Sequence, residues 1–188
     1  MSIRIFAINI TSSRGFITLS ADLRVNSTSV GLQAAPTFVE LLDGGLIQVW
    51  EGSGPNGTTS LFAQRFDSLA DPVGVELQLG TEKERDQRMP AAAVLGDTGF
   101  VVAWEDGNQS DGQTAIRVQA YDLSGAAIGG EILVTAQDSG LRTDPSIASM
   151  LDGGFVVTWQ SFGQGGSGWG VFARRRITRR QLAELAGA

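Results

Sequence analysis

DGGFVVTWQ, residues 152–160, is the stretch that decides how this chain folds, because two earlier segments are imperfect copies of it. The copies are DGGLIQVWE at residues 43–51 and DTGFVVAWE at residues 97–105. Tryptophan therefore recurs at positions 50, 104 and 159, with a period of about 55 residues. A period of this size is typical of the four-stranded sheets of a propeller-like repeat protein.

Each copy lies at the centre of a predicted unit of four strands, A to D. Strand A is expected to start just after Pro36, Pro90 and Pro145, since a proline at a strand start removes no ladder hydrogen bond. A glycine-containing turn then leads into strand B, a hydrophobic run that ends at the tryptophan. Strand C is predicted at residues 61–67, 116–122 and 171–176, and strand D at residues 75–79 and 131–134.

The same register explains the N-terminus, where residues 3–9 align with strand C and residues 22–26 with strand D. The sequence thus predicts an all-β domain at residues 1–176, built as a propeller-like array of about three four-stranded antiparallel sheets. Its parts are a half repeat at 1–32, repeats at 33–86 and 87–141, and a partial repeat at 142–176. A basic tail follows at 177–188, where a short helix and a frayed end are both plausible.

Three sheets are fewer than a closed propeller normally has. Three arrangements remain open: a homo-oligomer in which the N-terminal D strand completes the last sheet of another subunit, a fragment of a longer array, or an open stack. The oligomer would hide a sheet edge that is otherwise prone to aggregation. Residues 1–14 have the pattern of neither a signal peptide nor a membrane span, so no membrane insertion is expected.

Composition excludes several classes of chemistry. The 188 residues include 14 basic and 20 acidic side chains, and five of the basic ones lie at residues 174–180, so the rest of the chain is strongly acidic. Such a surface would repel nucleic acid and anionic membranes. The absence of Cys and His removes thiol nucleophiles, Ser-His-Asp triads and the usual zinc ligands, which leaves carboxylates, arginines and hydroxyls. No cofactor is expected.

The pattern P-x4-L-x-DGGFVVTWQS at residues 145–161 resembles the tandem repeats of large secreted bacterial proteins of the RTX and hemolysin-type calcium-binding kind. The resemblance covers about residues 20–176. It implies a β-propeller-like, non-catalytic module of an extracellular or cell-surface protein. The calcium-binding nonapeptides of such proteins are absent from this chain.

Four tryptophans are the candidate ligand-binding residues. Trp50, Trp104 and Trp159 could form a symmetric set of sugar-stacking platforms, although packing between sheets alone explains residues that follow the strand repeat. Trp169 is the better candidate for an exposed contact, since it sits in the glycine-rich loop at residues 163–170 and has no aromatic counterpart in the other repeats.

A single loop offers oxygen ligands for a hard cation. Asp106, Asn108, Ser110 and Asp111 lie at mostly alternate positions, a spacing that resembles calcium-binding loops. The loop lacks the glycine and the bidentate glutamate of an EF-hand, and its counterparts in the other repeats carry no carboxylate. A solvated hairpin is therefore favoured over a calcium site.

The sequence thus favours a non-enzymatic binding or structural module that acts in adhesion or scaffolding, with a surface glycan or a protein as its ligand. A propeller-type carbohydrate-binding lectin is the alternative. A glycoside hydrolase is a third hypothesis, because two carboxylates are enough for that chemistry, but no paired carboxylates stand out.

Overall fold

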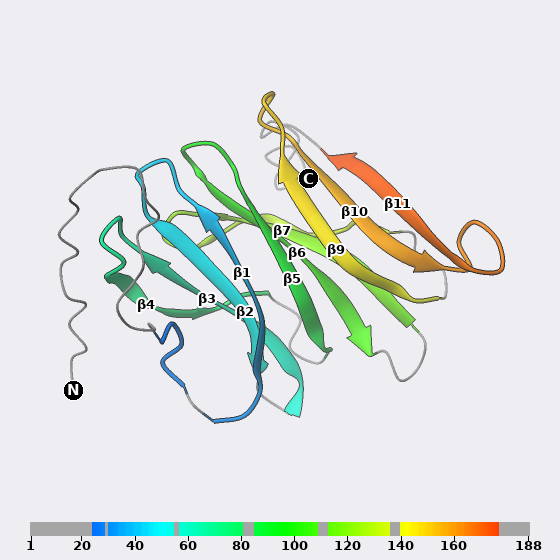
Figure 1. The fold of residues 1–188 in the computed structure, drawn as a ribbon, viewed down its shortest axis with the longest axis horizontal. Coiled ribbons are helices and arrows are strands. Elements are labelled where there is room, and N and C mark those ends of the chain that lie inside the picture. The colour runs from blue at the N-terminus through cyan, green and yellow to red at the C-terminus, as the bar shows by residue number, and fades with distance from the viewer. Residues whose placement is uncertain are drawn as a thin grey trace, which may run out of the picture.

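Eleven antiparallel strands form three sheets in the computed structural model (Figure 1). The structure describes residues 24–28, 30–54, 57–80, 85–108, 113–135 and 140–176, and these residues contain no helix. The three sheets follow one another along the chain, so each repeat forms a sheet of its own. The predicted all-β, propeller-like array is confirmed, while closure of the array is not shown.

The first sheet has the strand order β1-β2-β3-β4 and the second the order β5-β6-β7-β8, while the third has only three strands in the order β9-β10-β11. The strands of the first sheet are β1 (Gln33–Glu40), β2 (Leu46–Ser53), β3 (Thr59–Phe66) and β4 (Pro72–Gln78). Those of the second are β5 (Gln87–Val94), β6 (Gly99–Asn108), β7 (Gln113–Asp122) and β8 (Ala127–Leu133). Those of the third are β9 (Arg142–Ser149), β10 (Phe155–Phe162) and β11 (Trp169–Arg176).

The prolines lie inside the first strand of each sheet, which corrects the prediction that this strand starts after them. The register of β1 against β2 shifts between Ala34 and Thr37, around Pro36, and a matching shift occurs in the other two sheets. A bulge takes one residue out of the ladder, so the missing N–H of proline costs no hydrogen bond there. The sequence showed the proline but not the bulge.

Four further predictions differ from the structure or lie outside the described residues. Strands β4 and β8 begin three to four residues earlier than the predicted D strands. Residues 24–26, the described part of the predicted N-terminal D strand, belong to no strand. The predicted strand at 3–9 and the possible helix at 177–188 lie outside the described residues.

Each sheet has two faces, which we call front and back. The front face of the first sheet packs on the back face of the second, and the front face of the second packs on the back face of the third. Alternation along β6 decides which side chain enters which core: Phe100, Val102 and Trp104 point to the first sheet, while Val101 and Ala103 point to the third. Strand β6 is therefore buried on both faces, as its hydrophobic run predicts.

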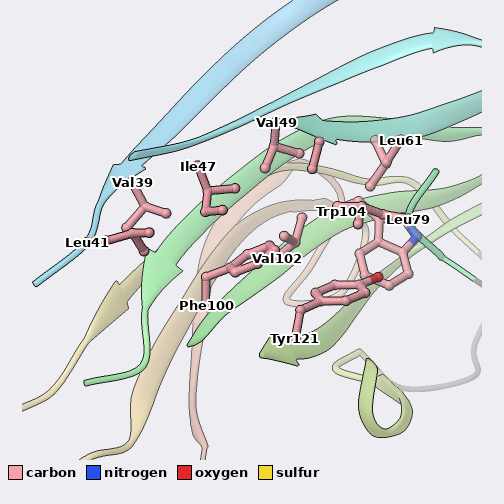
Figure 2. Close-up of a cluster of buried hydrophobic side chains, with 11 residues drawn as sticks. Val39, Leu41, Ile47, Val49, Leu61, Leu79, Phe100, Val102, Trp104 and Tyr121 are labelled. Carbon is pink, nitrogen blue, oxygen red and sulfur yellow. The ribbon is translucent and has the colours of Figure 1, made fainter. Parts of the chain in front are cut away.

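The core between the first two sheets illustrates this packing. Figure 2 shows Val39, Ile47 and Val49 of the first sheet facing Phe100 and Val102 of the second. The rings of Phe100 and Tyr121 stack with their centroids 5.3 Å apart. The first strands of the three sheets, β1, β5 and β9, lie side by side (Figure 1), so equivalent residues of successive repeats become neighbours.

Candidate functional site

Three of the four candidate tryptophans are buried. Trp104 and Trp159 lie in the two cores between sheets, and neither exposes an indole face. Trp50 occupies the equivalent place on the back face of the first sheet, where its ring stacks on Phe62 and its Nε1 donates to Oε1 of Gln33 at 2.8 Å. These positions agree with a role in packing between sheets, which was the alternative to sugar stacking for these tryptophans.

A small cavity of about 150 Å³ lies over Trp50 on the back face of the first sheet. Residues of β1, β2 and the segment before β1 line it: Val25, Asn26, Gln33, Ala34, Pro36, Gln48 and Trp50. In the second and third sheets, the equivalent tryptophans lie against a preceding sheet instead. The cavity therefore lies on a face that, among the described residues, packs on no other sheet.

Trp169 is the exposed tryptophan, with 55% of its surface accessible. It pairs with Phe162 across the β10–β11 hairpin, and the two rings meet edge to face with centroids 5.5 Å apart. Both side chains lie on the front face of the third sheet, together with Val171. The exposure predicted for Trp169 agrees with the structure.

The predicted cation loop is described only in part. Ser110, Asp111 and the side chain of Asn108 lie outside the described residues. Oδ2 of Asp106 accepts from Nε of Arg117 at 2.7 Å and forms an ion pair with Nε of Arg85 at 3.4 Å. These guanidinium groups supply the positive charge that a cation would bring. No group of three or more metal-ligating side chains occurs among the described residues.

A polar cluster joins the second and third sheets at the residue that precedes Pro145. Oε1 of Glu105, a buried side chain on β6, accepts hydrogen bonds from the hydroxyl of Thr143 and, at 2.8 Å, from the backbone N–H of Asp144. The exposed carboxylate of Asp144 accepts from Nε2 of Gln160 at 3.0 Å. The backbone and the carboxylate of Asp144 are therefore both held in place.

The first two sheets are joined by the same backbone link. Oε2 of Glu51 accepts from the backbone N–H of Met89 at 2.8 Å, and Met89 precedes Pro90. Ala35, Met89 and Asp144 have φ of 47°, 49° and 52°, a left-handed conformation that is uncommon for residues other than glycine. These three equivalent residues lie on β1, β5 and β9, and we call them the pre-proline row.

The pre-proline row brings different chemistry to adjacent strands. Met89 on β5 is 41% exposed and offers an apolar thioether, whereas Asp144 on β9, a strand that packs against β5, offers a carboxylate held by Gln160. Because β5 and β9 pack against each other, one ligand along the row could donate a hydroxyl hydrogen bond to the carboxylate and place its C–H groups against the thioether. The repeat pattern alone did not predict this site. The signal was present, however, as Glu51, Glu105 and Gln160 each follow a tryptophan.

Among the described residues, we find no helix that is both long and apolar enough to cross a membrane.

Comparisons with known proteins give a likeness of fold only. No family model matches the chain, and no curated protein matches it. One similar solved structure is described as the crystal structure of a thermostable family-43 glycoside hydrolase. It superposes with a TM-score of 0.52 at 12% sequence identity, over 78% of this chain and 55% of that chain. The chain thus spans about half the length of this structural relative.

This likeness corrects the prediction that the chain is not an enzyme. That prediction rested on the implied kinship with non-catalytic repeats and on the lack of an evident catalytic constellation. The same arrangement of sheets occurs in a glycoside hydrolase, so a non-catalytic role does not follow from the architecture. The comparisons give no support to adhesion or scaffolding, and the resemblance to RTX-type repeats stays a prediction.

Proposed function

We propose that this chain is a carbohydrate-binding protein that holds a sugar at the pre-proline row, with Asp144 as the main polar contact. The observation that carries the proposal is the fixed, exposed carboxylate of Asp144, held at its backbone by Glu105 and at Oδ2 by Gln160. A carboxylate that is already oriented loses little conformational entropy when it accepts a hydrogen bond from a sugar hydroxyl.

Each member of the cluster has a separate role in this proposal. Asp144 accepts a hydrogen bond from a hydroxyl of the sugar. Met89, on the first strand of the preceding sheet, contacts the apolar C–H face of the sugar. Glu105 and Gln160 are positioning residues, since their hydrogen bonds end on Asp144. The fold likeness to a family-43 glycoside hydrolase supports sugar as the ligand class, because a glycoside hydrolase acts on carbohydrates.

A glycan array followed by calorimetry on any glycan that binds would test this proposal. We expect Asp144→Ala to weaken binding by about tenfold or more, because a hydrogen bond to a charged group contributes about 1.5–3 kcal/mol. Asp97→Ala is the matched control, since Asp97 lies exposed in the β5–β6 turn, outside the row. Running the array with calcium and with a chelator tests the calcium hypothesis at the same time. A wild-type chain that binds no glycan in either condition would contradict the proposal.

Hydrolysis of the bound sugar is the second candidate. It is favoured by two carboxylates in one cluster, of which Glu105 is buried and Asp144 is exposed. Glycoside hydrolysis commonly uses two carboxyl groups in different environments. Release of reducing ends from a panel of polysaccharides by the wild type, and its loss in Asp144→Asn with binding retained, would support this role. Binding without release by the wild type would count against it.

The place of action is part of the same proposal. The repeat pattern that resembles secreted RTX-type proteins supports a location at the cell surface or outside the cell, where polysaccharides are abundant. Detection of the native protein in the cell surface or culture fraction of its source organism would test this location. Recovery of the protein in the soluble interior alone would contradict it.

A further inference from the structure

At its two ends the array presents a front face and a back face that pack on no further sheet among the described residues, although Val25 and Asn26 lie beside the buried Trp50 on the back face. Inside the array, a front face meets a back face twice, once between the first and second sheets and once between the second and third. The front face of the third sheet and the back face of the first have no such neighbour among the described residues. Both faces nevertheless retain the residues of the internal interfaces.

On the front face of the third sheet, a residue position that is buried in the other two sheets is exposed to solvent. Leu61, Ile116 and Val171 occupy the same register position in β3, β7 and β11, opposite the residue that follows the repeated tryptophan. Leu61 and Ile116 are 0% exposed, whereas Val171 is 80% exposed. The exposed pair Phe162 and Trp169 extends the same face, so Val171 belongs to an apolar surface rather than standing alone.

The back face of the first sheet shows the complementary pattern. Pro90 and Pro145 are buried at the internal interfaces, while Pro36 is exposed. Ala92 and Ile147 pack against the core formed with the preceding sheet, but the equivalent Phe38 is 65% exposed. A large apolar ring is thus in solvent at a position where the other sheets make contact.

The hydrogen bond that links neighbouring sheets also has its two halves at the ends of the array. The acceptor lies on the third sheet and the donor on the first. Glu51 and Glu105 each accept a hydrogen bond from the left-handed residue on the next sheet. Gln160 takes the place of these glutamates on the third sheet, and its amide oxygen is also an acceptor. Ala35 has the same left-handed φ as Met89 and Asp144, so its backbone presents the equivalent donor on the first sheet.

We propose that the front face of the third sheet is a docking surface for the first sheet of a second copy of this chain. The occupant is a second copy because the contact continues an interface that the chain already forms twice, with the same residue positions on both sides. Such a contact is head-to-tail. Two copies that each make it once would form a closed ring of six sheets with two equivalent interfaces between the copies. Trp169, Phe162 and Val171 then become interface residues, and Gln160 still holds Asp144.

Two charge insertions, one on each face, test the docking. The full-length wild type is expected to sediment as an oligomer of the 19.8 kDa chain at micromolar concentrations. Val171→Asp and Phe38→Glu should each shift it to the monomer, because both place an unpaired charge in an apolar contact. Both residues are exposed within one chain, so each variant keeps its fold, which circular dichroism checks. Leu151→Asp is the control, since Leu151 lies in the exposed β9–β10 turn.

A mixture of the two variants distinguishes head-to-tail docking from other contacts. Val171→Asp keeps an intact back face and Phe38→Glu an intact front face, so the mixture should form a heterodimer through one intact interface. A monomeric wild type would overturn the proposal. This holds also if the reason is that the chain's own N-terminal segment covers the back face of the first sheet. An oligomer that persists in both variants would also overturn it. Since no sugar enters the experiment, its failure is separate from failure of the proposed function.

Discussion

Glu105 and Asp144 join two sheets, since the carboxylate of one accepts a hydrogen bond from the backbone N–H of the other at 2.8 Å. Asp144 is in a left-handed conformation, which costs a residue other than glycine of the order of 1–3 kcal/mol. The charged acceptor compensates for part of this cost by fixing the N–H that the bulge leaves outside the ladder. Glu51 and Met89 repeat the same relationship one sheet earlier.

Removing this acceptor should destabilise the fold. Glu105→Ala leaves the part-buried N–H of Asp144 and the hydroxyl of Thr143 without their partner, so the free energy of unfolding should fall by about 2–3 kcal/mol. Glu105→Gln retains an amide oxygen as acceptor and should cost less than Glu105→Ala. Urea unfolding followed by tryptophan fluorescence measures both. Equal losses in the two variants would show that the hydrogen bond is not what stabilises this junction.

The repeat explains how much of the fold was predictable. Three tryptophans and three prolines at a common period predicted the sheets and the buried strand β6, because alternation and burial are properties of a single strand. The link between Glu105 and Asp144 was not predictable from either segment, since it forms only when successive sheets pack. Likewise, the ion pairs of Asp106 with Arg85 and Arg117 depend on side chains that the loop sequence does not contain.

The repeat pattern predicts buried positions better than exposed ones. Trp169 departs from the repeat, which predicts an exposed contact, and 55% of its surface is accessible. Its neighbour Val171 fits the repeat perfectly and gave no signal, because its counterparts Leu61 and Ile116 are equally apolar. The exposure of Val171 follows from its place at the end of the array, which a local pattern does not record.

Leu61 provides a test of the interface between the first two sheets. Leu61→Ala should lower the free energy of unfolding by about 2–5 kcal/mol, because it removes a fully buried side chain from a core shared by two sheets. Leu69→Ala is the same substitution at a residue that is 75% exposed in the β3–β4 turn, and it should change stability by less than about 0.5 kcal/mol. Comparable losses in the two variants would contradict the assignment of Leu61 to the core.

Tyr121 should report on the same core through its ionisation. It is the single tyrosine of the chain, and its hydroxyl oxygen accepts a hydrogen bond from the backbone N–H of Gly80 at 3.0 Å. Burial raises the pKa of Tyr121 to about 12. Tyrosinate absorbance should therefore appear near pH 12 in the native chain and near about pH 10 in urea.

The raised pKa of Tyr121 also has a consequence for stability. Because the fold favours the neutral phenol, this contribution is complete below about pH 10, the unfolded value, and is lost as the pH rises toward about 12. Tyr121→Phe should remove that alkaline loss, although it also removes the hydrogen bond to Gly80. Native titration near the ordinary tyrosine value would contradict the burial of this ring.

Asp122 should contribute to acid sensitivity. Hydrogen bonds from the Ser124 hydroxyl, and then from the backbone N–H groups of Ala126 and Ser124, lower the pKa of Asp122. A lowered pKa stabilises the fold above about pH 4, and this contribution is lost as the pH falls through the folded value. Asp122→Asn should therefore show a smaller stability difference between about pH 7 and about pH 3 than the wild type. Asp97→Asn is the control, and an equal reduction there would contradict the assignment.

Gly99, in the segment 97–105, is a position where even one added methyl group should destabilise the fold. A Cβ added there would lie 1.8 Å from the backbone oxygen of Tyr121, on the neighbouring strand β7, so one of the two strands has to move. Gly45 holds the same position in the first sheet, where an added Cβ would lie 2.5 Å from the backbone oxygen of Phe66. We expect Gly99→Ala to lower the free energy of unfolding by about 1–3 kcal/mol or more, as overpacking against backbone does.

Gly130→Ala is the matched control, because an added Cβ there meets no atom within 4 Å. Thermal unfolding of the two variants measures the difference, and a Gly99→Ala protein as stable as Gly130→Ala would show that β6 and β7 do not approach each other as closely as the structure requires.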